Sequence, residues 1–285
     1  MTLAFVCIKW GEAYPAEDVN ILYQGVSDHV SEPFRFICLT DRPDGLRPEV
    51  EVADLPATGA LGLRWRGCWP KLGMFAPGIL AGVDLAVYLD LDIVILRSLD
   101  PIIAHARARP GLHVLREWNP NVWELLPVSM RPDRGAQSSM VAWRPGEQDH
   151  LYLDVMANPD AAYALVKNDQ RYIGIKARDR HYFPPGFAVS FRRHLVPHYP
   201  LNLLFKRIRK PARAAVVVFH GAPKPLEVAE DGAGAWGTRM RPGFGPVDWV
   251  RDYWKRGRDG ARVALARQAG EPTEAAPPQP RQISS

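Results

Sequence analysis

The sequence feature that most constrains the fold is the run Leu85–Leu91, which is apolar apart from Asp90. A strand that is apolar along its length is expected at the centre of a sheet covered on both faces. Leu3–Lys9 has the same character, and apolar residues at three- and four-residue spacing follow it in a segment that begins at Pro15. Strand, helix and strand in succession predict right-handed crossovers and a mostly parallel sheet in an α/β fold.

Further apolar runs extend this pattern along the chain. The predicted strands are Phe34–Thr40, Val50–Val52, Gln137–Trp143 and Ala215–His220, and the predicted helices are Trp69–Phe75, Leu151–Met156, Arg171–Ile175 and Trp249–Arg267. We expect a single domain over residues 1–267, ending in a basic helix at about 249–267. Residues 268–285 are dominated by Pro, Gln, Glu, Ala and Ser, which predicts a disordered tail.

Cysteine content and hydropathy point to a cytoplasmic protein. The three cysteines show no CxxC spacing, which argues against a disulfide scaffold or a zinc ribbon and fits a reducing compartment. The amino-terminal segment lacks the pattern of a secretory signal, and no apolar run approaches the length needed to cross a bilayer.

Basic residues are concentrated in the last third of the chain. Phe205–Arg267 contains fourteen Lys or Arg against six Asp or Glu, whereas the whole chain has a net charge of only +5. Such a surface could contact phosphates or an anionic membrane, or it could simply be solvated. No aromatic-basic motif of the usual nucleic-acid-binding kinds is present, so we expect no nucleic-acid partner.

Two carboxylates follow the Leu85 run, at Asp90 and Asp92. Residues two apart in extended chain point to the same face, and the carboxyl edge of an open α/β sheet is where ligands bind. The two charges repel each other unless they share a cation or a proton. A hard divalent ion that bridges them to a diphosphate would resolve the repulsion, so the pair predicts a metal site.

A second motif ends the strand predicted at Ala215–His220. His220 is followed by Gly221 and, after two residues, by Lys224 and a proline. Glycine allows close approach of a ligand to the backbone, and a lysine beyond it supplies a point charge for phosphate. A nitrogen ligand beside two carboxylates would favour Mn²⁺ over Mg²⁺. The alternative is a hydrogen-bonded histidine with a structural role.

The third motif is the tripeptide Asn168-Asp169-Gln170. By itself this tripeptide assigns no chemistry, and it gains meaning only together with the other two motifs. The alternative is that it caps the helix predicted to follow.

Taken together and in this order, the three motifs resemble the retaining glycosyltransferases of the GT-A fold. The most similar type is that of glycogenin and the bacterial lipopolysaccharide galactosyl- and glucosyltransferases. The resemblance extends from about Leu3 to Lys224 and implies a UDP-sugar donor, Mn²⁺ (or Mg²⁺) as cofactor, and a glycan, lipid-linked or other acceptor. It implies metal ligation by Asp90, Asp92 and His220.

The resemblance also implies which residues contact the donor. It places Lys224 and Gly221 at the donor phosphates, Asp169 and Gln170 as the catalytic residues beside the transferred sugar, and the base near the end of the first strand. The donor-binding residues implied in addition to Asp90 are Lys9, Trp10, Tyr14, Lys71, Gln137 and Ser138. This chain departs from the family where His220 directly precedes Gly221, and where Leu226 follows Lys-Pro in place of tryptophan.

Two other readings fit part of the sequence. Asp90-Leu91-Asp92-Ile93-Val94 also fits the nucleophile motif of haloacid-dehalogenase-type phosphohydrolases, although that motif normally follows the first strand and a late Gly-Asp-x-x-x-Asp element is missing. A non-catalytic module that binds nucleotide-sugars or glycans would retain the same residues. Turnover of donor to UDP distinguishes these readings.

Overall fold

The computed structural model describes residues 1–56, 68–119, 123, 126–197, 201–204, 207–230, 232, 234–238 and 241–270. The strands are β1 (Leu3–Lys9), β2 (Phe34–Thr40), β3 (Glu51–Asp54), β4 (Leu85–Leu89), β5 (Ile93–Ile95), β6 (Leu112–Arg116), β7 (Ala136–Trp143), β8 (Arg180–Tyr182), β9 (Ala188–Ser190), β10 (Val216–Val218), β11 (Ala235–Thr238) and β12 (Arg241–Phe244). The α-helices are α1 (Ala16–Ser27), α2 (Asp100–Arg107), α4 (His150–Ala157), α5 (Pro159–Leu165), α6 (Asp169–Lys176), α7 (Leu201–Leu204), α8 (Pro225–Ala229) and α9 (Asp248–Gln268). Two 3-10 helices, η1 (Trp69–Phe75) and η2 (Val128–Met130), and a π-helical turn, η3 (Phe191–Leu195), complete the described elements.

The main sheet has seven described strands in the order β3-β2-β1-β4-β7-β6-β8. Strand β1 pairs in parallel with β2 and β4, β2 pairs in parallel with β3, and β6 pairs in parallel with β8. Strand β7 runs antiparallel to its neighbours β4 and β6. The prediction of an α/β fold with a mostly parallel central sheet is therefore confirmed.

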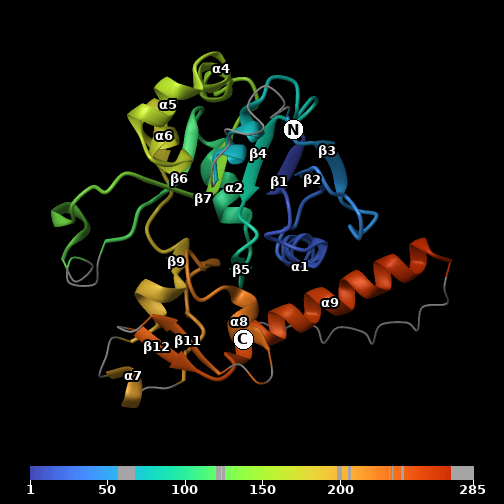
Figure 1. Cartoon of the computed structure of the whole chain (residues 1–285), viewed down its shortest axis with the longest axis vertical. Coiled ribbons are helices and arrows are strands. Elements are labelled where there is room, and N and C mark those ends of the chain that lie inside the picture. The colour runs from blue at the N-terminus through green and yellow to red at the C-terminus, as the bar shows by residue number, and fades with distance from the viewer. Residues whose placement is uncertain are drawn as a thin grey trace.

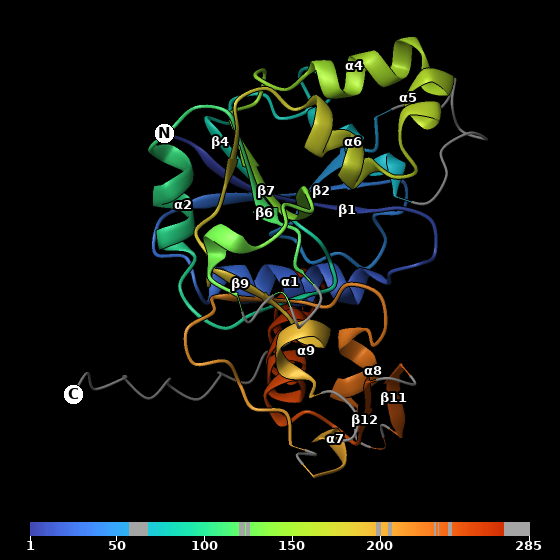
Figure 2. The ribbon, with the colours of Figure 1, turned by 90° about the vertical axis from the view of Figure 1, so that its left-hand side faces the viewer.

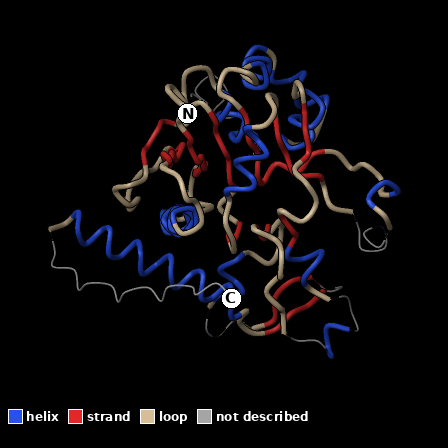
Figure 3. Tube along the Cα trace, turned by 180° about the vertical axis from the view of Figure 1, so that it is seen from behind, coloured by secondary structure: helices blue, strands red, loops and turns tan. Residues whose placement is uncertain are grey.

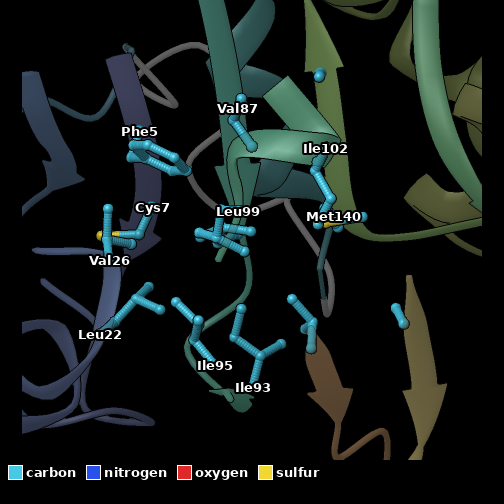
Figure 4. Packing of buried hydrophobic residues seen from close by; sticks show 14 of the residues in the cluster. Phe5, Cys7, Leu22, Val26, Val87, Ile93, Ile95, Leu99, Ile102 and Met140 are labelled. Atoms are coloured by element: carbon cyan, nitrogen blue, oxygen red, sulfur yellow. The ribbon is translucent and has the colours of Figure 1, made fainter. Parts of the chain in front are cut away.

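Strand β1 is buried on both faces, which explains its continuous apolar sequence. Phe5 and Cys7 face Leu22 and Val26 of α1 (Figure 4). The alternate residues, beginning at Ala4, belong to the cluster on the other face, under η1, α4, α5 and α6. Figure 2 shows the sheet between α1 on one side and α4, α5 and α6 on the other.

A second, three-stranded sheet in the order β5-β10-β9 lies below the first (Figure 1). The chain passes from β4 in the main sheet to β5 in the small one through Asp90–Asp92. Strand β10 runs antiparallel to β5, with Val218 opposite Ile93. The carboxyl end of β10 therefore arrives where β5 begins, beside the two aspartates.

The last helix, α9, packs closely on the first, α1. A Cβ atom added to Gly257 would lie 2.8 Å from the side chain of Ile21, and one added to Gly25 would overlap the Tyr253 hydroxyl. Trp254 is buried on the same side of α9. The apolar side of this basic helix is thus directed toward the protein, and Figure 3 shows its far end extending beyond the body.

The structure differs from the sequence predictions at element ends and in elements that were not predicted, among them β5, β6, β8 and α2. The strand predicted over Leu85–Leu91 ends at Leu89, and the one predicted over Ala215–His220 spans only Val216–Val218. Both shorten because the chain leaves a sheet where the polar residues of the motifs begin. No helix in the described part of the chain is long and apolar enough to cross a membrane. From residue 271 on, the predicted tail lies outside the described residues.

Candidate functional site

Asp90 lies directly beyond β4 and forms a buried ion pair with Lys71 of η1. The Asp90 Oδ1 atom is 2.7 Å from Lys71 Nζ and accepts a hydrogen bond of 2.6 Å from the Tyr88 hydroxyl. Lys71 also donates to the carbonyl and the hydroxyl of Ser138, at 3.2 Å each. Burial alone would raise the pKa of Asp90, but the charge and hydrogen bond of Lys71 outweigh it and hold that pKa below its ordinary value.

Asp92 forms the second pair, with Lys224 from the loop beyond β10. Lys224 Nζ is 2.6 Å from Asp92 Oδ2 and donates to the Tyr14 hydroxyl at 2.8 Å. That hydroxyl is itself 3.3 Å from Asp92 Oδ2. Burial and then the charge of Asp90 raise the pKa of Asp92, and Lys224 opposes this shift. The same burial, with the charge of Asp92, raises the pKa of Tyr14 to about 12.

The repulsion predicted between the two carboxylates is therefore offset by two lysines. Lys71 neutralises Asp90, and Lys224 neutralises Asp92. A backbone contact holds the second pair together. Phe219 N–H donates to the Asp92 carbonyl at 2.9 Å, which continues the pairing of β10 with β5 and brings the Lys224 loop to the aspartates.

Asp90 and Asp92 are the residues of this cluster that could hold a metal ion. Carboxylate oxygens together with substrate phosphate oxygens are the ligands that Mg²⁺ and other hard cations prefer, so Asp90 and Asp92 fit such an ion. Within the described ranges, no group of three His, Cys, Asp or Glu lies close enough to hold a metal ion. His220 is thus not gathered with the two aspartates.

His220 is held instead by Ser190 and Trp118. Its Nε2 atom lies 2.6 Å from Ser190 Oγ, and its ring stacks on the Trp118 ring with centroids 5.4 Å apart and an interplanar angle of 16°. Burial, followed by the charges of Arg193 and Arg192, lowers the pKa of His220 to about 4. The imidazole is therefore neutral at pH 7, the form that can coordinate a metal.

Asp169 and Gln170 open helix α6, but neither caps it. Asn168 is the cap, because its side-chain oxygen accepts from Arg171 N–H at 2.9 Å. Asp169 is 3% exposed, and among the described residues its Oδ2 atom has no hydrogen-bond partner. Burial raises its pKa to about 6, although the nearby Lys71 acts in the opposite direction. Gln170 donates from Nε2 to Glu117 Oε2 at 2.7 Å.

The other residues predicted to bind the donor are partly engaged elsewhere. Gln137 is buried and bonds within β7, donating to Ser139 Oγ at 2.5 Å and accepting from Ser139 N–H at 2.9 Å. Lys9 donates to the Arg42 carbonyl at 3.0 Å, beyond β2. Trp10 packs against the sheet face that carries η1. Gly221 has a φ of 79°, a conformation that favours glycine.

Sequence reasoning missed four side chains of this region: Tyr88, Glu117, Trp118 and Ser190. Tyr88 could have been found, because it lies two residues before Asp90 and residues two apart share a face in extended chain. The other three reach the site from β6 and β9, and no sequence motif marks them.

A cavity of about 270 Å³ adjoins Glu117 and Trp118. Its walls come from the end of β6 and from the segment that links β8 to β9, including Tyr182, Phe183 and Pro184. Because Glu117 bonds Gln170 and Trp118 stacks on His220, the cavity borders both polar motifs.

No protein-family model and no curated protein sequence matches this chain. Solved structures do. The galactosyltransferase LgtC, in complex with donor and acceptor sugar analogues, matches over 90% of this chain and 95% of its own, with a TM-score of 0.57 and 14% identity. The glycosyltransferase GlyE of Streptococcus pneumoniae TIGR4 matches over 94% of this chain and 64% of its own, with a TM-score of 0.56 and 10% identity. The match to the bifunctional glycosyltransferase WbbM covers 94% of this chain and 51% of the WbbM chain, with a TM-score of 0.53 and 12% identity.

At such low identities the likeness concerns the backbone rather than individual side chains. It spans nearly the whole of this chain and most of LgtC. The expectation drawn from the sequence resemblance is confirmed at this level: the chain has the fold of the GT-A glycosyltransferases related to the bacterial lipopolysaccharide galactosyltransferases.

Proposed function

We propose that this protein is a glycosyltransferase that moves a hexose from a UDP-sugar to a glycan, a lipid-linked sugar or another acceptor. The observation that carries the proposal is the Lys71–Asp90–Asp92–Lys224 cluster at the junction of the two sheets, within a GT-A fold. A diphosphate presents negative charges that match the lysines and oxygens that match a carboxylate-bound cation. The phosphohydrolase alternative places its aspartates after the first strand, whereas this pair follows β4.

The leaving group would be stabilised mainly by charge. Lys224 is half-exposed, so its ammonium can turn from Asp92 to a diphosphate, while Lys71 remains buried with Asp90. A bound Mn²⁺ or Mg²⁺ would be held by Asp90 and Asp92 and would act as a Lewis acid on the departing diphosphate. His220 is neutral, but it would have to leave Ser190 and Trp118 to join the two aspartates as a third ligand.

The remaining residues would bind and orient the donor. Tyr14, already beside Lys224, would contact the nucleotide together with Lys9 and Trp10. Asp169 and Gln170 would contact the transferred sugar, and the unpartnered buried oxygen of Asp169 is suited to a sugar hydroxyl. Gln137 and Ser138 would support this side of the site through β7 and Lys71.

The acceptor would occupy the cavity beside Glu117 and Trp118, whose aromatic walls suit the apolar face of a sugar ring.

We also propose a cytoplasmic location with peripheral contact to an anionic membrane through α9. Several arginines of α9 already pair with acidic residues, as Arg256 does with Asp28 at 2.7 Å and Arg258 with Glu17 at 2.9 Å. Membrane contact would therefore use the charged outer side of the helix.

Measuring donor binding by the wild-type protein and by the Asp92→Asn variant tests the proposed function. Calorimetric titration of UDP with Mn²⁺ should show wild-type binding that is lost in the variant, with the far-UV spectrum unchanged. UDP-glucose, UDP-galactose, their N-acetyl forms and GDP-mannose are then compared for nucleotide release with Mn²⁺ and with EDTA. Undiminished UDP affinity in Asp92→Asn would contradict the metal site, and turnover of p-nitrophenyl phosphate instead of any donor would favour a phosphohydrolase.

A further inference from the structure

We propose that Glu117 is a positioning residue that fixes which end of the Gln170 carboxamide faces the transferred sugar. This inference rests on the proposed function, because it assigns a role within the same site. Gln170 Nε2 donates to Glu117 Oε2 at 2.7 Å, a short distance typical of a charge-assisted hydrogen bond. A carboxylate only accepts hydrogen bonds, so the amide nitrogen must face Glu117. The carbonyl oxygen of Gln170 is then the atom left for the sugar.

The backbones of Glu117 and Gln170 are each held by contacts other than the hydrogen bond between their side chains. Glu117 follows β6, and its N–H donates to the Gly135 carbonyl at 2.9 Å. Gln170 lies in the first turn of α6, which is capped by Asn168 and packs tightly on β7 near Gly174, where an added Cβ would lie 3.2 Å from Ala136. The Glu117–Gln170 bond therefore joins two fixed elements, and its loss would free the amide rather than the backbone.

A primary carboxamide has nearly the same shape in its two flipped orientations, so packing alone selects poorly between them. A negative charge at Glu117 selects strongly, because the flipped amide would place its oxygen against the carboxylate. Glu117 also lines the cavity proposed for the acceptor. An acceptor seated there would exclude water from the Glu117–Gln170 bond and strengthen it.

Glu117→Gln is the decisive variant. The new amide can accept from Gln170 Nε2 or donate to Gln170 Oε1, so packing and a hydrogen bond are retained while the orientation is no longer selected. Transfer kcat should fall about twofold, because only about half of the molecules then present the Gln170 oxygen to the sugar. Donor affinity and acceptor KM should be unchanged. Glu117→Asp, which keeps the charge, should retain more activity than Glu117→Gln.

Glu147→Gln is the matched control. Glu147 accepts from Gly111 N–H at 2.9 Å, and Gly111 precedes β6 whereas Glu117 follows it. The control removes the same charge at the opposite end of the strand and should leave kcat unchanged.

The second test is a double-mutant cycle with Gln170→Ala. If Glu117 acts through Gln170, Glu117→Gln adds no further loss once Gln170 is alanine. An equal loss in both backgrounds, or a rise in acceptor KM at constant kcat, would overturn the positioning role. So would a Glu117→Asp enzyme that is less active than Glu117→Gln at the same melting temperature.

Nitrogen-15 glutamine labelling separates this inference from the proposed function. The side-chain NH₂ signal of Gln170, identified by its loss in Gln170→Ala, should move in Glu117→Gln and stay in place in Glu147→Gln. An unmoved signal overturns the inference whatever the enzyme does. Absence of UDP release from every donor by the wild-type protein would instead overturn the proposed function.

Discussion

The two carboxylate–lysine pairs have nearly the same length but different surroundings. Lys71 and Asp90, 2.7 Å apart, have side chains that are 7% and 21% exposed. Lys224 and Asp92, 2.6 Å apart, are 43% and 11% exposed. The first pair joins η1 to the end of β4, and the second joins Asp92 to a loop 132 residues later in the chain.

This difference separates a structural ion pair from one that can exchange partners. Removing one member of a buried pair leaves the other charge without compensation and is strongly destabilising. In the second pair Asp92 is buried but Lys224 is half-exposed, so water solvates this lysine and it can turn to a ligand at lower cost than Lys71. We therefore expect Lys71 to support the fold and Lys224 to serve the diphosphate.

The largest expected effect is that of Lys71→Met on stability. Asp90 would remain buried without its cation, and the free energy of unfolding should fall by about 3–5 kcal/mol. Urea denaturation measures it, and adding Asp90→Asn should recover part of the loss because the uncompensated charge is then removed. A loss below about 1 kcal/mol would show that the first pair behaves like the second.

Asp169→Asn should raise the free energy of unfolding of the protein while lowering its transfer activity. Burial raises the pKa of Asp169 from 3.8 to about 6, so the ionised carboxylate disfavours the fold above pH 6. At pH 7 the variant should be more stable by up to about 3 kcal/mol, and the difference should disappear as the pH falls from 6 to below 4. Transfer should slow by about 10²-fold. Urea midpoints across this pH range test it, and a constant difference would contradict the assignment.

Lys224→Met should lower UDP affinity more than it lowers stability. The free energy of unfolding should fall by less than in Lys71→Met, because the lysine removed here is 43% exposed and already solvated. UDP affinity should fall by at least about tenfold, because a charge-assisted phosphate contact is lost. Melting temperature and calorimetric UDP titration are measured on the same samples. A loss of stability as large as that of Lys71→Met would remove the distinction between the pairs.

The smallest expected difference between the two ion pairs is in their dependence on salt. Between 0.05 and 0.5 M NaCl, the coupling energy of Lys224 with Asp92 should shrink by a few tenths of a kcal/mol, since exposed charges are screened over these distances. The coupling of Lys71 with Asp90 should not change. Double-mutant cycles at both salt concentrations provide the two values, and equal shrinkage would contradict the difference in burial.

Local patterns predicted the N-terminal sheet well. Leu3–Lys9 and Phe34–Thr40 are strands over those same residues, because buried parallel strands have continuous apolar sequences that are visible without any partner. Strands β5, β8, β9, β11 and β12 were not predicted, since each is only three or four residues long and depends on distant neighbours for pairing. The five-residue strand β6 was also missed.

The same distinction applies to the site. Asp90 and Asp92 could be singled out because the motif is local, and the cap at Asn168 follows from its position before the predicted helix. That each carboxylate has its own lysine could not be predicted, because Lys71 and Lys224 are brought in by η1 and by the pairing of β10 with β5. Likewise, the Ser190 and Trp118 contacts of His220 depend on tertiary packing.

The close contact between α1 and α9 has a consequence for how the chain is made. Ile21 and Gly25 of α1 are covered by α9, yet about 220 residues separate the two helices. At a translation rate of about 5–20 residues per second, α1 waits roughly 10–45 seconds for its partner to be synthesised. Throughout that interval the nascent protein presents an apolar helix face next to an already formed strand. The amino-terminal part of the fold is therefore completed only when the last helix has left the ribosome.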